Sequence, residues 1–191
     1  MFDHFLPNYD FREVHVTAVR VGRDRVYRAI KEIRSGEIPL LWFLFALRAL
    51  PALLTRRGKL PFGGDQPFLD QMIASGFVLL AEETDRQLVL GTVGQFWRAL
   101  ERPLQLANAS EFLAFDRPAY AKAVTNFFIA ESLGRTGVVL TTETRIHVPS
   151  PAARRKFAAY WFMIRLPSGL LRRMILRAIK IRAEGHQLAS S

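Results

Sequence analysis

The sequence of 191 residues contains no cysteine. That absence excludes thiol catalysis, iron–sulfur ligation and any zinc site with cysteine ligands, and it fits a reducing compartment. A long charge-free apolar run is also missing. The most hydrophobic stretch, Ile38–Leu54, has Ile38–Leu47 as its charge-free part, well short of the roughly 20 residues that span a bilayer. We therefore expect a buried helix there.

Signals for export and for common catalytic chemistry are absent as well. Asp3 stands where a signal peptide would carry basic residues, so we expect a cytoplasmic protein. The sequence has no P-loop and no Gly-x-Ser-x-Gly elbow. Its four histidines are scattered, without the i, i+4 spacing of a helical metal site: His4, His15, His147 and His186. We expect no metal and no cofactor.

Acidic residues are scarce at one end of the chain. The net charge is +10, and residues 151–191 contribute +8 of it, with nine basic side chains and one acid. Arg173, Arg177 and Lys180 lie three or four residues apart and share a helix face. A solvated face is the simplest interpretation, and a weak contact with an anionic membrane surface is the alternative. Nucleic acid is not expected, because the aromatic residues do not alternate with the arginines.

What is present is a clear order of elements. Arg12–Val19 alternates in polarity like a strand, Asp24 is expected to cap a helix that Ser35-Gly36 ends, and a second helix follows at Ile38–Leu54. The remaining expected elements are a loop at Thr55–Gly64, a short helix at Pro67–Ala74, strands at Phe77–Glu82, Gln87–Trp97, Glu111–Phe115, Ala119–Ala130 and Val138–Val148, and a long helix from Pro151.

This order predicts an α+β fold. A sheet with one apolar face needs a cover, and the terminal helix is the element that can supply it. We expect a single domain over 1–191, with strand, two helices and sheet over 10–148 and the closing helix over 151–184. Pro167-Ser168-Gly169 predicts a kink or a break in that helix, because proline removes a backbone donor.

Three segments carry a resemblance to a known superfamily: VHVTAVRVGRDRVYRAI (14–30), TGVVLTTETRIHV (136–148) and PAARRKFAAYWFMIR (151–165). Their order resembles the helix-grip fold of the START and Bet v 1-like (SRPBCC) superfamily, which includes polyketide cyclase-like and lipid-transfer proteins. The resemblance implies a curved antiparallel sheet wrapped around a long C-terminal helix. It also implies that a hydrophobic or amphipathic small molecule, lipid- or polyketide-like, binds in a cavity between them.

One face of the last hairpin is expected to point towards the closing helix, because a slip of one residue would send charges into the core. We predict that this face and two tryptophans line the cavity, although aromatic residues at helical spacing also fit a plain core. The candidate ligand-binding residues are Trp42, Thr125, Phe127, Leu140, Thr142, Thr144 and Trp161.

The opposite face of the hairpin carries Asn126, Glu143 and Arg145, which we expect to face water as cross-strand pairs. In the alternative, they project into the cavity and hold a polar group or act as acid and base. The resemblance thus favours a ligand-binding protein. A cyclase- or dehydratase-type enzyme using Glu143 and Arg145, and a module docking to a membrane surface or partner through the basic helix, remain open. The oligomeric state is not predicted.

Overall fold

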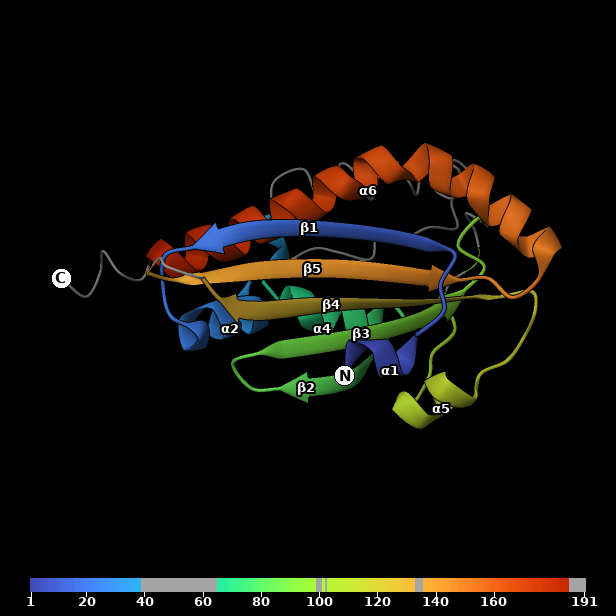
Figure 1. Cartoon of the computed structure of the whole chain (residues 1–191), viewed down its shortest axis with the longest axis horizontal. Coiled ribbons are helices and arrows are strands. Elements are labelled where there is room, and N and C mark those ends of the chain that lie inside the picture. Colours follow the sequence, from blue (N-terminus) through green and yellow to red (C-terminus); the bar gives the residue numbers. More distant parts are fainter. Residues whose placement is uncertain (39–64, 99–100, 102, 133–135, 186–191) are drawn as a thin grey trace.

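The computed structural model describes residues 1–38, 65–98, 101, 103–132 and 136–185 (Figure 1). Trp42, the expected loop Thr55–Gly64 and the expected helix after Ile38 lie outside these residues. The elements within them are α1 (Phe2–Phe5), β1 (Phe11–Val19), α2 (Arg23–Glu32), the 3-10 turn η1 (Ser35–Glu37), α4 (Phe68–Ala74), β2 (Phe77–Glu83), β3 (Gln87–Gly94), α5 (Ala109–Ala114), β4 (Ala121–Glu131), β5 (Val138–His147) and α6 (Pro151–Gly185). The α+β class is confirmed.

The strands form one antiparallel sheet of five strands in the order β1-β5-β4-β3-β2. The first strand therefore pairs with the last, over a register that runs from Phe11 opposite Ile146 to Val19 opposite Val138. β4 and β5 form the hairpin that the sequence predicts, with Thr125 opposite Thr144. Their apolar sets share one face, as the alternation requires.

Helices cover both faces of the sheet. We call the face under α6 the inner face and the opposite one the outer face. α2, α4 and α6 pack on the inner face around Leu88, Leu90, Phe127, Ile129 and Leu140. The short α1 and α5 pack on the outer face (Figure 1) around Val78, Leu80, Val89, Val93 and Val124. Every residue of β3 is consequently buried.

The expected strand Glu111–Phe115 is wrong, because all of this segment except Phe115 belongs to helix α5. The side chain of Asn108 caps the helix by accepting a hydrogen bond from the Glu111 backbone N–H (2.9 Å). Glu111 in turn accepts one from the Ala107 N–H (2.8 Å). Such reciprocal capping fixes a helix start. It also brings Phe112, which is fully buried, against β3.

Two boundaries also differ from expectation. β3 ends at Gly94, short of Trp97. The N-cap of α2 is Gly22, and Asp24 lies within the first turn, where its charge favours the helix N-terminus.

α6 continues through Pro167 without a break. The helix instead bends in an arch over the sheet (Figure 1). Proline leaves the carbonyl of Met163 without its helical donor, and Met163 is exposed, so water can hydrate that carbonyl. Across the described residues, no helix has both the length and the apolar character needed to cross a membrane.

Gly91 provides the space that lets α5 approach β3, and this generates a prediction. A Cβ at Gly91 would lie 2.7 Å from Leu80 Cδ1 and 2.9 Å from the Phe112 ring. Gly91→Ala should therefore lower the free energy of unfolding by about 1–3 kcal/mol, measured by urea denaturation. Gly36→Ala is the control, since a Cβ at Gly36 meets nothing within 4 Å. Equal stabilities of the two variants would contradict the close approach.

Candidate functional site

Five polar side chains gather between the inner face and α6, and we call them the inner polar cluster: Glu13 and His15 from β1, Thr125 from β4, Thr144 from β5 and Arg172 from α6. Arg172 donates from Nη1 to Thr144 Oγ1 at 2.5 Å and more weakly to Thr125 Oγ1 at 3.5 Å. The Thr144 hydroxyl donates to Thr125 Oγ1 at 2.7 Å. A charged group of α6 therefore enters the layer between the sheet and the helix.

The carboxylate of Glu13 completes this cluster. His15 Nε2 lies 2.9 Å from Glu13 Oε1, and Arg172 Nε lies 3.6 Å from Glu13 Oε2. Glu13 and His15 side chains are about one-tenth exposed, at 10% and 11%. The geometry combines one positive charge, one carboxylate, an imidazole and two hydroxyls in a confined volume.

Two atoms of the cluster are left without hydrogen bonds. Arg172 Nε and Glu13 Oε2 are both buried and have no hydrogen-bond partner among the described residues. Burial lowers the pKa of Arg172 from its ordinary value, and the charge of Glu13 opposes that shift. A buried donor and a buried acceptor that stay unsatisfied cost free energy. Such a pair needs an explanation, such as a bound polar group.

Gly169 allows α6 to approach the cluster closely. A Cβ at this position would lie 2.7 Å from Glu13 Oε1 and 3.5 Å from the His15 ring. Any larger residue would displace Glu13 from its place between His15 and Arg172. The glycine of the Pro167-Ser168-Gly169 segment therefore makes room for β1 and does not end the helix.

The structure places most of the predicted ligand-binding residues where the alternation puts them. Thr125, Phe127, Leu140, Thr142 and Thr144 are buried on the inner face. Their role in binding a ligand stays a prediction.

Trp161 lies further along, in an aromatic group at the start of α6. Its ring centroid is 5.9 Å from that of Phe157, which it stacks on, and 5.8 Å from that of Phe11.

Sequence reasoning missed Glu13, His15 and Arg172. In β1 the apolar Val14 and Val16 are exposed, on the outer face, and the polar set faces α6. The alternation of β1 alone favours the opposite orientation, in which Val14 and Val16 face the core. The register decides it, because Glu13 pairs opposite Thr144 and therefore shares its face. Only the pairing of β1 with β5 reveals this orientation, and that pairing cannot be read from the sequence.

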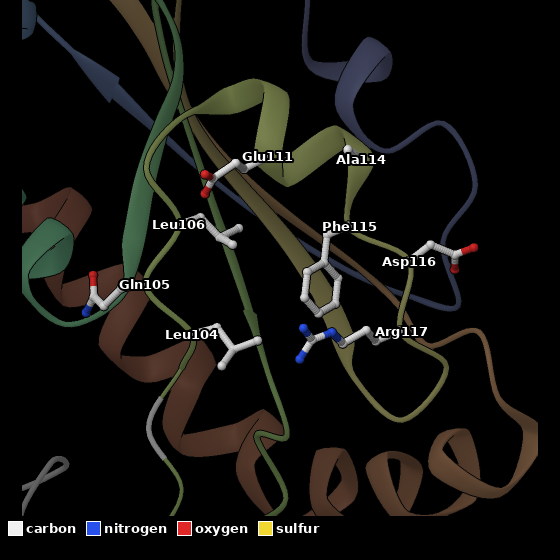
Figure 2. Close-up of a pocket in the computed structure, with 8 residues that line it drawn as sticks. All are labelled: Leu104, Gln105, Leu106, Glu111, Ala114, Phe115, Asp116 and Arg117. Atoms are coloured by element: carbon white, nitrogen blue, oxygen red, sulfur yellow. The ribbon is translucent and has the colours of Figure 1, made fainter.

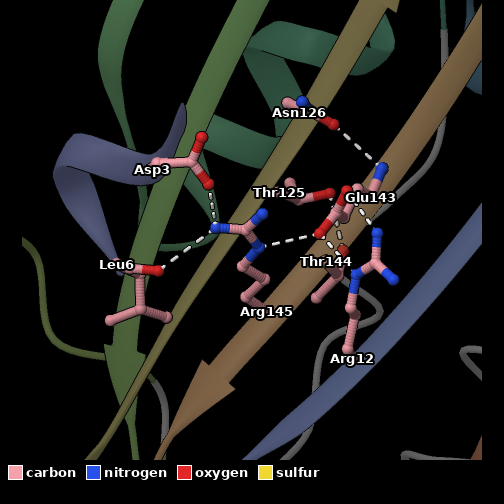
Figure 3. Close-up of polar contacts among 8 residues, drawn as sticks. All are labelled: Asp3, Leu6, Arg12, Thr125, Asn126, Glu143, Thr144 and Arg145. Atoms are coloured by element: carbon pink, nitrogen blue, oxygen red, sulfur yellow. Dashed lines mark hydrogen bonds and ion pairs between the residues drawn. The ribbon is translucent and has the colours of Figure 1, made fainter. Parts of the chain in front are cut away.

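On the outer face, Asn126, Glu143 and Arg145 form a network (Figure 3). Glu143 Oε1 accepts from Arg12 Nε and from Arg145 Nε, both at 2.7 Å. Asn126 Oδ1 accepts from the Glu143 backbone N–H at 2.9 Å. The expectation that these side chains face water is wrong, since Glu143 and Arg145 are only 13% and 12% exposed. They do not face α6 either.

The N-terminal segment covers this network. Arg145 Nη1 bonds Asp3 Oδ1 at 2.5 Å, and its guanidinium lies 4.6 Å from the centre of the Phe2 ring and 4.8 Å from that of Tyr9. Burial by itself would raise the pKa of Glu143. The hydrogen bonds and charges of Arg12 and Arg145 outweigh burial, so this pKa lies below its ordinary value. The arrangement attaches α1 to the sheet.

Two depressions lie away from the inner polar cluster. One, of about 590 Å³, lies beside α5 on the outer side (Figure 2), with Leu104, Leu106, Phe115 and Arg117 among its lining residues. The other, of about 640 Å³, lies where the end of β1, the β4–β5 hairpin and α6 meet. Lys180 of α6 lines it and donates to the Ala18 carbonyl at 2.8 Å.

Comparison with known proteins does not assign the chain to a family. No family model matches the sequence, and no curated protein matches it. Among solved structures, protein MLL2253 from Mesorhizobium loti is similar over 91% of this chain and 97% of its own, with 13% sequence identity and a TM-score of 0.41. The functional argument therefore depends on the site itself.

Glu143 generates a pH-dependent prediction. Its pKa is lowered in the folded state, so its stabilising effect is complete above the ordinary value of 4.5 and is lost as pH falls through the folded value. Glu143→Gln should lower the free energy of unfolding at pH 7 by about 1.5–3 kcal/mol, the range for hydrogen bonds to charged groups. The difference in the free energy of unfolding between Glu143→Gln and wild type should become smaller below pH 4.5.

Urea denaturation at a series of pH values measures this difference. Glu83→Gln is the matched control, because Glu83 pairs with Arg86 on the surface and such pairs contribute about 0–1 kcal/mol. A difference between Glu143→Gln and wild type that is as large at pH 3 as at pH 7 would contradict the assignment.

Proposed function

We propose that the chain has a helix-grip fold of the SRPBCC type and binds an amphipathic small molecule between the inner face and α6. The observation that carries this proposal is the inner polar cluster, with its unsatisfied Arg172 Nε and Glu13 Oε2. Buried charges are costly unless they are paired and hydrogen-bonded. An arginine kept at this interface is therefore best explained by a polar group that it recognises.

The free atoms of the cluster indicate the chemistry of that group. The charges of Arg172 and Glu13 balance each other at 3.6 Å, so neither an anion nor a cation is favoured. The two buried atoms without a hydrogen-bond partner in the described part of the chain are a donor, the Arg172 Nε–H, and an acceptor, Glu13 Oε2. A hydroxyl group accepts from the first and donates to the second. We therefore propose a neutral ligand with a hydroxyl or similar group at its polar end.

The surroundings of the cluster suit an apolar body. Phe127 and Leu140 belong to the buried inner-face core, and the aromatic group of Phe11, Phe157 and Trp161 lies at the start of β1 and α6. Burial of apolar ligand surface, at about 25 cal/mol per Å², would drive association. The polar cluster would then fix the orientation of the ligand. We do not favour an enzyme that uses Glu143 and Arg145, since both lie on the outer face beneath α1.

Native mass spectrometry of the purified protein is the first test. We expect a small molecule that is retained under gentle conditions and released on denaturation, with an apolar body and a hydroxyl, enol or amide group. A released molecule with a permanent charge at its only polar end would contradict the head-group assignment. An empty protein calls for the direct binding measurement.

That measurement uses three ligands that share one ten-carbon chain: decanol, decanoate and decyltrimethylammonium. Titration followed by tryptophan fluorescence should show the tightest binding for decanol. Arg172→Gln should weaken decanol binding by about tenfold to a hundredfold, the effect of losing a hydrogen bond to a charged group. Thr144→Val, which removes the hydroxyl that accepts from Arg172, provides a second variant if Arg172→Gln folds poorly.

Arg173→Gln is the matched control, because Arg173 is the next residue of α6 and is exposed. Its decanol affinity should stay within twofold of wild type. Equal affinities for all three ligands, or an unchanged affinity in Arg172→Gln, would overturn the proposal.

A further inference from the structure

The side of α6 that faces away from the sheet carries large exposed apolar residues. Phe162, Met163 and Leu166 are 86%, 77% and 83% exposed, and Leu170 is 46% exposed. Phe162, Leu166 and Leu170 are spaced by four residues and Met163 lies beside them, so they form one continuous strip on the helix. We call these four residues the apolar strip. Contiguous exposed apolar surface of this kind marks an interaction site more often than scattered residues do.

Basic residues flank the apolar strip at both ends. Arg155 and Lys156 precede it, and Arg173 and Arg177 follow it at the same spacing of three to four residues. All four are exposed, and the ion pairs between α6 and the described residues involve other basic side chains, Arg154, Arg172, Lys180 and Arg182. The acid in α6, Glu184, lies near its end and pairs with Lys180. The surface therefore presents apolar side chains within positive charge and no exposed carboxylate.

The combination of an apolar strip with basic neighbours is typical of a helix that binds a membrane surface. A helix with an apolar strip and basic neighbours lies in the plane of a bilayer, with the apolar residues among the acyl chains and the basic residues at the phosphates. Figure 1 shows α6 along the rim of the molecule, where no other labelled element lies on its outward side. Nucleic acid would use the arginines but would leave the aliphatic side chains in water.

We propose that α6 docks on an anionic membrane surface through the apolar strip, Arg155, Lys156, Arg173 and Arg177. Docking is peripheral, because no helix within the described ranges can cross a bilayer. The proposal is independent of ligand binding, since its residues are exposed and none of them belongs to the inner polar cluster. The same helix therefore has two separate tasks, on two different sides.

Flotation with large unilamellar vesicles tests the proposal. Vesicles contain either phosphatidylcholine alone or phosphatidylcholine with 30% phosphatidylserine, in 50 mM or 300 mM salt. Wild-type protein should float with the anionic vesicles at 50 mM salt, float much less at 300 mM, and stay behind with phosphatidylcholine alone. Binding to both vesicle types alike, or to neither, would overturn the proposal.

Two double variants separate the apolar and electrostatic contributions. Phe162→Ser with Leu166→Ser should lower the partition coefficient at least tenfold on anionic vesicles, because it removes buried apolar area. Arg173→Gln with Arg177→Gln should lower it about fivefold for each arginine. Both pairs are exposed, so the fold should survive, and circular dichroism checks this.

The matched controls are elsewhere on the surface. Leu113→Ser changes an exposed apolar residue of α5, and Arg86→Gln with Arg117→Gln removes two exposed charges outside α6. Each control should float like wild type.

Sedimentation velocity without vesicles examines the rival occupant, a second copy of the chain. A dimer that Phe162→Ser with Leu166→Ser abolishes, together with no flotation of the wild type, would assign the apolar strip to self-association and overturn the membrane proposal.

Discussion

Polar contacts attach α6 to the edge strand β1 and to the residues just before and after it, and the position of the closing helix depends on them. They follow one another in parallel order along the two elements: Asp10 with Arg154 at 3.0 Å, Glu13 with Arg172 at 3.6 Å, the Ala18 carbonyl with Lys180 at 2.8 Å and the Arg20 N–H with Glu184 at 2.8 Å. Between the first and last contacts the helix is about 45 Å long, while the strand covers about 33 Å. The helix must therefore bow outward, as Figure 1 shows. The apolar strip lies on the bowed part.

The contact between Glu13 and Arg172 is also the least expected on energetic grounds. Replacing a buried ion pair by well-packed apolar residues is often neutral or stabilising. If the pair only had to hold α6 on the sheet, Val or Leu in place of Glu13 and Arg172 would be sufficient. The two atoms left without hydrogen bonds make the arrangement costlier still. Glu143 and Arg145 differ, because their network satisfies its charges and fastens α1.

Much of the architecture could be predicted from the sequence. The alternation of Leu140, Thr142 and Thr144 with charged neighbours placed the hairpin faces correctly, since only one register avoids burying the charges. The cover over Glu143 could not be predicted, because α1 is a single turn without periodicity. The polar cluster could not be predicted either. Its members come from three strands and a helix, and the pairing of β1 with β5 that brings Glu13 beside Thr144 joins residues 131 positions apart in the sequence.

That pairing has a consequence for how the protein is made. β1 leaves the ribosome well before its partner in the sheet, β5, which ends at His147. The attachment of α1 to the sheet is delayed in the same way, because Asp3 pairs with Arg145, which lies in β5. The two-stranded ladders β2–β3 and β3–β4 can form beforehand from neighbouring segments. β1 stays unpaired until β5 has been synthesised, and contacts of such long sequence separation slow folding. During that interval its exposed backbone edge is available to chaperones or to a neighbouring chain.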